Sequence, residues 1–162
     1  MSSRDIRSQA GPHVFVDDLD HPILANDDHH HLARALRLRD GDPFTLSDGQ
    51  GQWRAARFAD VIEPTTELYR VPAPPYRLGL GVALTKAAKP EFAVQKATEI
   101  GIDDIVVFEA EHSVARWDEN KRARNQERFE RIAREAAMQS RRVTIPEAVS
   151  YTHLTLPTIY SV

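Results

Sequence analysis

The first seventy residues carry short apolar runs separated by turn residues, a pattern typical of a small, mostly β unit. Within this part, Leu32, Ala35 and Leu36 recur at helical spacing, so we expect a helix from Asn26, which two acids follow, to about Arg37. Residues 1–12 are polar and aperiodic, and we interpret them as a loose, disordered leader outside the fold. Strands are predicted at residues 13–16, 43–47, 52–62 and 67–71, with the second and third joined by the hairpin connection Asp48-Gly49-Gln50-Gly51.

A proline-rich stretch at residues 72–77 divides the chain, because three prolines in four positions forbid a helix and favour a stiff, extended linker. After it, a strand at 78–84, a helix from Pro90 to Gly101 and a strand at 105–108 have the strand–helix–strand order of a parallel sheet. A longer helix is expected from Asp118 to about Ser140. The predicted fold class is therefore α/β, with domains at residues 13–71 and 78–148.

The final segment, residues 149–162, has neither charged residues nor a hydrophobic period. It closely resembles one reading frame of a common transposase sequencing adapter, so we interpret it as a non-native tail that should be left out of fold reasoning. On this interpretation the native sequence is cut at about Ala148. We further expect that the tail from Tyr151 onward has no partner strand.

Composition narrows the function classes. With 41% hydrophobic and 28% charged residues the chain is typical of a globular protein. No apolar run approaches the roughly 18 residues of a membrane span, and the N-terminus lacks the apolar region of a signal peptide, so we expect a cytoplasmic protein without a membrane partner. The absence of cysteine excludes disulfides, thiolate zinc sites and cysteine nucleophiles. The tract His29-His30-His31 has no further ligands at metal-binding spacing, so no metal is expected.

The net charge of -3 hides an asymmetry, since residues 1–70 hold 8 basic and 12 acidic side chains, whereas residues 116–142 hold 9 basic and 5 acidic ones. A polyanion should therefore prefer the second half. Lys86 and Lys89 lie in the loop between a strand and a helix N-terminus, where anions gather, although ordinary surface lysines would look the same. Arg141 and Arg142, at the end of the long helix, suit either a phosphate clamp or a partner for the helix dipole.

The helix that follows this loop offers a second group of candidates. Gln95 and Glu99 lie four positions apart and therefore on one face, with Lys96 beside them, but a surface salt-bridge set explains these residues nearly as well. No glycine-rich phosphate fingerprint, nucleophile elbow or paired-carboxylate motif is present. The residues alone thus indicate a two-domain α/β protein and leave both interpretations of the anion candidates open.

The chain resembles the RsmE family, methyltransferases that modify N3 of a uridine in small-subunit (16S) ribosomal RNA. The resemblance covers residues 13–148, and its most specific parts are the run Gln95-Lys96-Ala97-Thr98-Glu99-Ile100-Gly101 and the ending Gln139-Ser140 with Arg142. Shorter matches are His31-Leu32, Leu36-Arg37, Gly41-Asp42, Asp48-Gly49, Lys86, Glu91 and Glu135-Ala136.

This resemblance implies a PUA-like β-barrel that helps to hold RNA, followed by the first part of a SPOUT-class domain with a trefoil knot, working as a homodimer with S-adenosylmethionine. The loops that form the knot and the cofactor pocket in the family have no counterpart in residues 1–162. The fragment is therefore expected to be inactive alone, and no catalytic or cofactor-binding residue is assigned. The implied RNA contacts are Arg37, Arg39, Lys86, Lys89, Arg141 and Arg142, and the implied active-site lining is Gln95, Lys96, Glu99 and Gln139.

Two other functions fit the same residues. A standalone RNA-binding module would have the same barrel and basic patches but no donor pocket even when complete. A protein-interaction module would dock through the long charged helix and would bind RNA weakly and without salt dependence. The acidity of the first domain departs from what an RNA-holding module should show.

Overall fold

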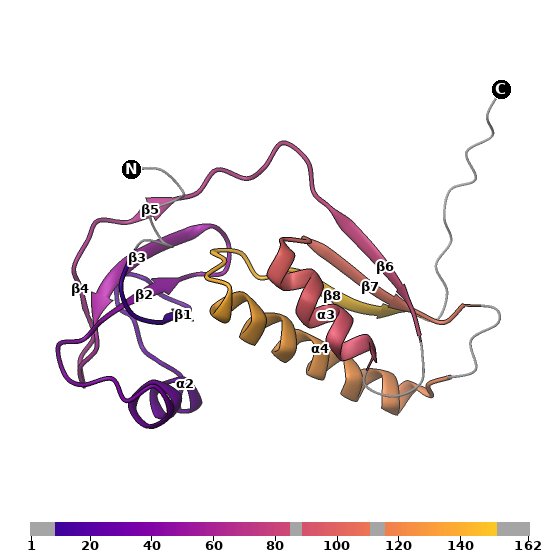
Figure 1. The fold of residues 1–162 in the computed structure, drawn as a ribbon, viewed down its shortest axis with the longest axis horizontal. Coiled ribbons are helices and arrows are strands. Elements are labelled where there is room, and N and C mark those ends of the chain that lie inside the picture. The colour runs from indigo at the N-terminus through magenta and orange to yellow at the C-terminus, as the bar shows by residue number, and fades with distance from the viewer. Residues whose placement is uncertain (1–8, 85–88, 111–115, 152–162) are drawn as a thin grey trace. The chain divides into compact units, whose positions relative to one another are not determined.

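The computed structural model describes residues 9–84, 89–110 and 116–151, which fall into two compact units (Figure 1). Unit 1 comprises residues 1–76 with 135–145, and unit 2 comprises residues 77–134 with 146–162. This division differs from the linear boundary expected at the prolines, because the end of the long helix and the segment after it belong to the N-terminal unit. The prolines lie in an exposed stretch without helix or strand, at residues 72–78.

Unit 1 is built on a five-stranded sheet. Its strands are β1 (His13–Phe15), β2 (Pro43–Ser47), β3 (Gln52–Arg57), β4 (Glu63–Pro64) and β5 (Tyr69–Arg70). β1 runs parallel to β2, whereas β2, β4 and β5 are all antiparallel to β3. The predicted hairpin between β2 and β3 is confirmed, and Gly49 (φ 72°) and Gly51 (φ 104°) adopt the left-handed conformation that favours glycine. The strand expected at 52–62 ends earlier, at Arg57.

The helix of unit 1 is shorter and wider than the sequence pattern predicts. α2 (Asn26–His30) passes directly into a π-helical turn, η1 (His31–Ala35), so the helix ends before Arg37. Ala25 occupies the N-cap position without a side-chain hydrogen bond, and the capped start expected at Asn26 is therefore not formed. Leu32, on η1, is completely buried and packs with Phe44, Leu46 and other apolar side chains in the core of unit 1.

Residues 9–12 belong to unit 1, which corrects the expectation that residues 1–12 are a loose leader. The Thr45 N–H donates to the Pro12 carbonyl at 2.9 Å. Gly11 has φ 83°, and a Cβ at this position would lie 1.7 Å from the Pro43 carbonyl oxygen, so only glycine fits here. Residues 1–8 lie outside the described residues.

Unit 2 is a three-stranded parallel sheet of β6 (Gly79–Ala83), β7 (Asp104–Phe108) and β8 (Glu147–Tyr151), with β7 in the middle. The helices α3 (Lys89–Ile100) and α4 (Glu119–Gln139) connect the strands and pack on one face of the sheet (Figure 1). On that face Ile105 and Val107 are buried with side chains from both helices. The strand–helix–strand order predicted from the sequence is thus confirmed, as is the long helix.

β8 contains the first residues of the supposed tail. Val149 pairs with Val106, and Tyr151 pairs with Phe108. The expectation that Tyr151 has no partner strand is therefore wrong, because the ladder uses backbone N–H and C=O groups, which every residue except proline supplies in full. Residues 152–162 lie outside the described residues, and the adapter origin of the segment stays a prediction.

No helix in the described part of the chain is long and apolar enough to cross a membrane.

Candidate functional site

The end of η1 places Arg37 in an unusual backbone conformation on the surface of unit 1. Its φ is 57°, in the left-handed region, and its side chain is exposed. The Leu36 N–H donates to the His31 carbonyl at 3.0 Å, and the Leu38 N–H donates to the Leu32 carbonyl at 3.0 Å, so the helix closes around Arg37. The residue at this position of a helix end is most often glycine.

The turn that follows fixes Arg39. The Arg39 N–H donates to Asp42 Oδ2 at 2.7 Å, and the Asp42 N–H donates back to the Arg39 carbonyl at 3.0 Å. The N–H of Gly41 (φ 88°) donates to the carbonyl of Phe58, the residue directly after β3, at 2.8 Å. The described residues offer no hydrogen-bond or ion-pair partner to the exposed guanidinium groups of Arg37 and Arg39.

α4 ends in a second left-handed arginine. Arg141 has φ 53°, its N–H donates to the Met138 carbonyl at 3.2 Å, and the Arg142 N–H donates to the Ala137 carbonyl at 2.9 Å, which together form a Schellman motif. The guanidinium of Arg141 donates to the carbonyl oxygens of Gln9 and Gly11. This predicted RNA contact therefore holds the N-terminal segment of its own unit.

His13 binds the same helix end from the sheet side. Its Nε2 lies 2.9 Å from the Arg142 carbonyl and its Nδ1 lies 2.9 Å from Thr45 Oγ1, and the side chain is buried. Burial lowers the pKa of His13 from 6.5 to about 4; the hydrogen bond to the Arg142 carbonyl opposes this shift, and the nearby charge of Arg141 adds to it. The ring is therefore neutral at pH 7, and Nε2 carries the proton that it donates to the carbonyl.

Three of the four residues expected to line an active site lie on α3 in unit 2, and the fourth, Gln139, belongs to unit 1. Lys96 and Glu99 form an ion pair on α3, with Lys96 Nζ 2.7 Å from Glu99 Oε2, as the surface salt-bridge interpretation expects. Gln95 is exposed on the same helix. Gln139 is exposed as the last residue of α4.

Of the two lysine candidates, the structure describes only Lys89. Lys89 is the exposed first residue of α3, whereas Lys86 lies outside the described residues. Close to this start, Glu91 Oε1 lies 3.4 Å from Arg128 Nη1, while its Oε2 is buried without a hydrogen-bond partner among the described residues.

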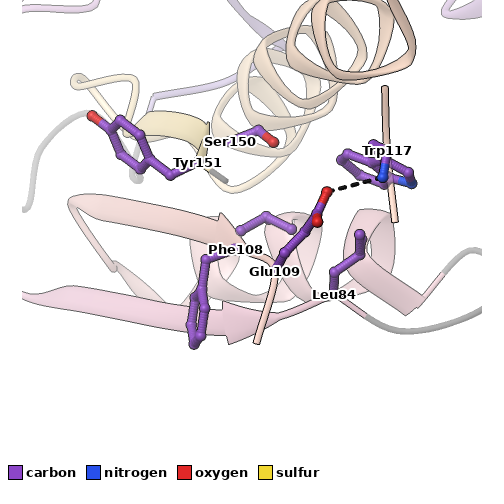
Figure 2. A pocket seen from close by; sticks show the side chains of 7 residues that line it. Leu84, Phe108, Glu109, Trp117, Ser150 and Tyr151 are labelled. Atoms are coloured by element: carbon purple, nitrogen blue, oxygen red, sulfur yellow. Dashed lines mark hydrogen bonds between the residues drawn. The ribbon is translucent and has the colours of Figure 1, made fainter. Parts of the chain in front are cut away.

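The carboxyl ends of the three parallel strands of unit 2 meet at a small hollow, the strand-end hollow (Figure 2). Glu109 directly follows β7, and its Oε1 accepts the Trp117 N–H at 2.9 Å and lies 3.7 Å from Arg122 Nη2. Ligands of open α/β sheets bind at this edge. The hollow is open to solvent and encloses no space for a ligand, so the described residues form a corner and not a complete pocket. Its lining consists of Leu84, Val107, Phe108, Glu109, Trp117, Ser150 and Tyr151.

Sequence reasoning missed Glu109, Trp117 and Arg122 as residues of this edge. A signal for Glu109 is present in the sequence, because this residue directly follows a predicted parallel strand, as the loop that contains Lys86 and Lys89 does. Across the described ranges, no three histidine, aspartate or glutamate side chains lie close enough to hold a metal ion. One residue of the histidine tract, His29, instead stacks on Phe58 with ring centroids 5.1 Å apart.

Comparison with known protein families gives two matches. Residues 24–64 match the RNA methyltransferase PUA domain, and residues 72–156 match the RNA methyltransferase domain. The second match does not stop at Ala148, where the sequence pattern suggested that the native chain is cut.

Curated relatives of the chain are described as ribosomal RNA methyltransferases. The chain is 35% identical over 133 residues to the ribosomal RNA small subunit methyltransferase E of Mycobacterium bovis, covering 76% of this chain and 49% of the relative. It is 29% identical over 135 residues to the Bacillus subtilis protein of that description, covering 78% of this chain and 52% of the relative. The chain thus spans about half the length of the curated relatives that it matches.

Solved structures share the fold. A probable rRNA-methyltransferase from Porphyromonas gingivalis aligns with a TM-score of 0.66 at 29% identity, covering 88% of this chain and 60% of that one. The small subunit methyltransferase E of Neisseria gonorrhoeae, solved with bound S-adenosyl methionine, aligns with a TM-score of 0.74 at 21% identity, covering 88% of this chain and 62% of that one.

Proposed function

Because the chain belongs to the RsmE family of RNA methyltransferases, we propose that the complete protein methylates N3 of a uridine in 16S ribosomal RNA with S-adenosylmethionine as the methyl donor. The observation that carries this proposal is the order of the matched domains, a PUA domain followed by a methyltransferase domain in one chain. Methyl transfer requires the acceptor nitrogen to be held in line with the donor methyl group, and an RNA-holding module beside a transfer domain meets that need.

The described residues do not by themselves fit the methyl donor. The strand-end hollow has the position expected for a cofactor site, but it encloses no space for a nucleoside-sized ligand. We therefore propose that the donor pocket of the complete protein lies in the part of the relatives that this match does not span, and we assign no chemical step to the residues present. On this proposal residues 1–162 alone transfer no methyl group.

The contribution of the described residues is to bind RNA. Arg37 and Arg39 in unit 1 and Lys89 in unit 2 present exposed cationic side chains, which suit phosphate contacts. Arg141 acts indirectly in this proposal, since its guanidinium holds the N-terminal segment against the end of α4 that also carries Arg142. The excess of acidic residues in residues 1–70 favours a few local contacts over a diffuse positive field.

The proposal includes the oligomeric state and the cellular location of the complete protein. The family resemblance supports a homodimer of the complete protein, acting in the cytoplasm on the small ribosomal subunit. Equilibrium sedimentation of the complete protein tests the dimer directly, and a monomeric mass would contradict it.

The activity test uses the complete protein, S-adenosylmethionine with a labelled methyl group, and small ribosomal subunits that lack the modification. After incubation, the RNA is digested to nucleosides and analysed by mass spectrometry. We expect label in 3-methyluridine, and label in a 2′-O-methyl or 5-methyl nucleoside would contradict the N3 assignment. RNA binding by the complete protein without any methyl transfer would instead support the standalone RNA-binding module. Residues 1–162 serve as the matched control and should transfer no label.

A further inference from the structure

The described chain has two residues other than glycine with positive φ, and both are arginines at helix ends. Arg141 (φ 53°) is explained by its side chain, which donates to the carbonyl oxygens of Gln9 and Gly11. Arg37 (φ 57°) occupies the equivalent position after η1, but its side chain is exposed and has no partner among the described residues. A residue with a side chain is disfavoured in this conformation relative to glycine, so Arg37 destabilises the helix end. No contact of its side chain with the described residues offsets this cost.

Strained backbone of this kind persists at sites that bind a ligand. The ligand that best suits a guanidinium group is an oxyanion, which it can bind through two parallel hydrogen bonds. We propose that Arg37 anchors a phosphate-binding corner, formed with Arg34 and Arg39, that grips the RNA backbone. This inference rests on the RNA-binding function proposed above and deepens it, because it singles out one helix end as the principal contact of unit 1.

The neighbouring residues prepare this corner. Arg34, in the last turn of η1, is exposed like Arg37 and Arg39. Asp42, an acid of the same turn, uses Oδ2 to accept the Arg39 N–H at 2.7 Å, which holds the turn in place. Asp40 is also exposed, and its acidic side chain lowers the positive potential around the three arginines. The corner therefore favours an anion in direct contact and attracts distant anions less.

The test compares the wild-type chain with Arg37→Gly and Arg37→Ala. Binding of in vitro transcribed 16S ribosomal RNA is measured at several KCl concentrations, and thermal unfolding is measured on the same samples. Both variants should lose about tenfold in affinity, and the slope of log K against log salt should fall by about 0.7 to 0.9. Only Arg37→Gly should raise the unfolding midpoint, by about 4 °C or more, because only glycine relieves the left-handed backbone.

If Arg37 had only a structural role, one of two other results would be seen. Arg37→Gly would bind RNA as tightly as the wild type, or it would lose both stability and RNA affinity. Either result overturns the corner. Arg70→Ala removes the same charge from an exposed position on β5 and should leave affinity and slope unchanged; an equal loss there would also overturn the assignment. Failure of the wild-type chain itself to bind the RNA would contradict the RNA-holding role of unit 1, and so distinguishes failure of the proposed function from failure of the corner alone.

Discussion

His13 joins three segments of unit 1 through one imidazole ring. It lies on β1, contacts Thr45 on β2 at 2.9 Å and contacts the Arg142 carbonyl beyond α4 at 2.9 Å. The ring must be neutral to accept a hydrogen bond at Nδ1, and protonation would place a buried positive charge near Arg141. This single residue therefore links the stability of unit 1 to pH.

We expect acid to destabilise unit 1 through His13. Its pKa is 6.5 when unfolded and about 4 when folded, so below pH 6.5 the unfolded chain takes up a proton that the folded chain does not. The free energy of unfolding should fall by about 3 kcal/mol between pH 6.5 and 4 and should change no further through this group at lower pH. Urea titrations across this range measure the fall.

The control for this prediction is His13→Gln, which removes the titrating ring. Its stability should be lower at pH 7, where the wild type is intact, and should vary less between pH 6.5 and 4. Equal pH dependence in the two proteins would show that His13 does not cause the fall.

At the scale of elements, the segment after α4 pairs with the β2–β3 hairpin. The Gly51 N–H donates to the Val143 carbonyl at 2.9 Å, and the Ile145 N–H donates to the Gly49 carbonyl at 3.0 Å. Ser47 Oγ lies 3.0 Å from the Val143 carbonyl as well. Val143 is buried and packs with Trp53, so this short segment completes a satellite core of unit 1.

We therefore expect Val143→Ala to lower the free energy of unfolding by about 1.5 kcal/mol, since two buried methyl groups are lost. The fluorescence of Trp53, recorded in a Trp117→Phe background, reports on this core directly. Val149→Ala in β8 is the matched control, because the same atoms are removed from a half-buried position outside unit 1. An equal or larger loss in the control would contradict the importance of the segment.

Local sequence pattern predicts the elements that depend on local contacts. The bounds of α3, α4, β6 and β7 follow from apolar spacing and from punctuation such as Gly101. The pattern does not predict that residues 9–12 are held or that residues 143–145 pair with the hairpin, because the partners lie far apart in sequence, as Arg141 and Gly11 do. The two candidate arginines differ for the same reason. The exposure of Arg37 depends on nearby residues, whereas the hydrogen bonds of the Arg141 side chain depend on a segment far away in the sequence.

At the scale of the whole molecule, unit 2 has one sheet face that its described helices do not cover. In unit 2 both helices cover one face of the sheet, and on the opposite face Phe108 is half-buried and Tyr151 is 49% exposed. The strand-end hollow is likewise a corner without a full enclosure. The cofactor pocket proposed above lies outside residues 1–162, so no pattern within these residues can locate it.

We expect residues 1–162 to bind S-adenosylmethionine weakly, because the strand-end hollow encloses no space in which such a ligand could be buried. Isothermal titration calorimetry should give no micromolar binding for this chain and clear binding for the complete protein. Micromolar affinity of the short chain would show that the described residues already make the pocket.

The assignment of residues 135–145 to unit 1 has a consequence for synthesis on the ribosome. The N-terminal unit lacks one of its own pieces until residue 145 has left the exit tunnel, long after its sheet has emerged at residue 76. At about 5 to 20 residues per second, those intervening residues take roughly 3 to 14 s to make. During that interval the nascent unit exposes the hairpin edge that will later receive Val143, and a chaperone at the tunnel mouth would meet this edge first.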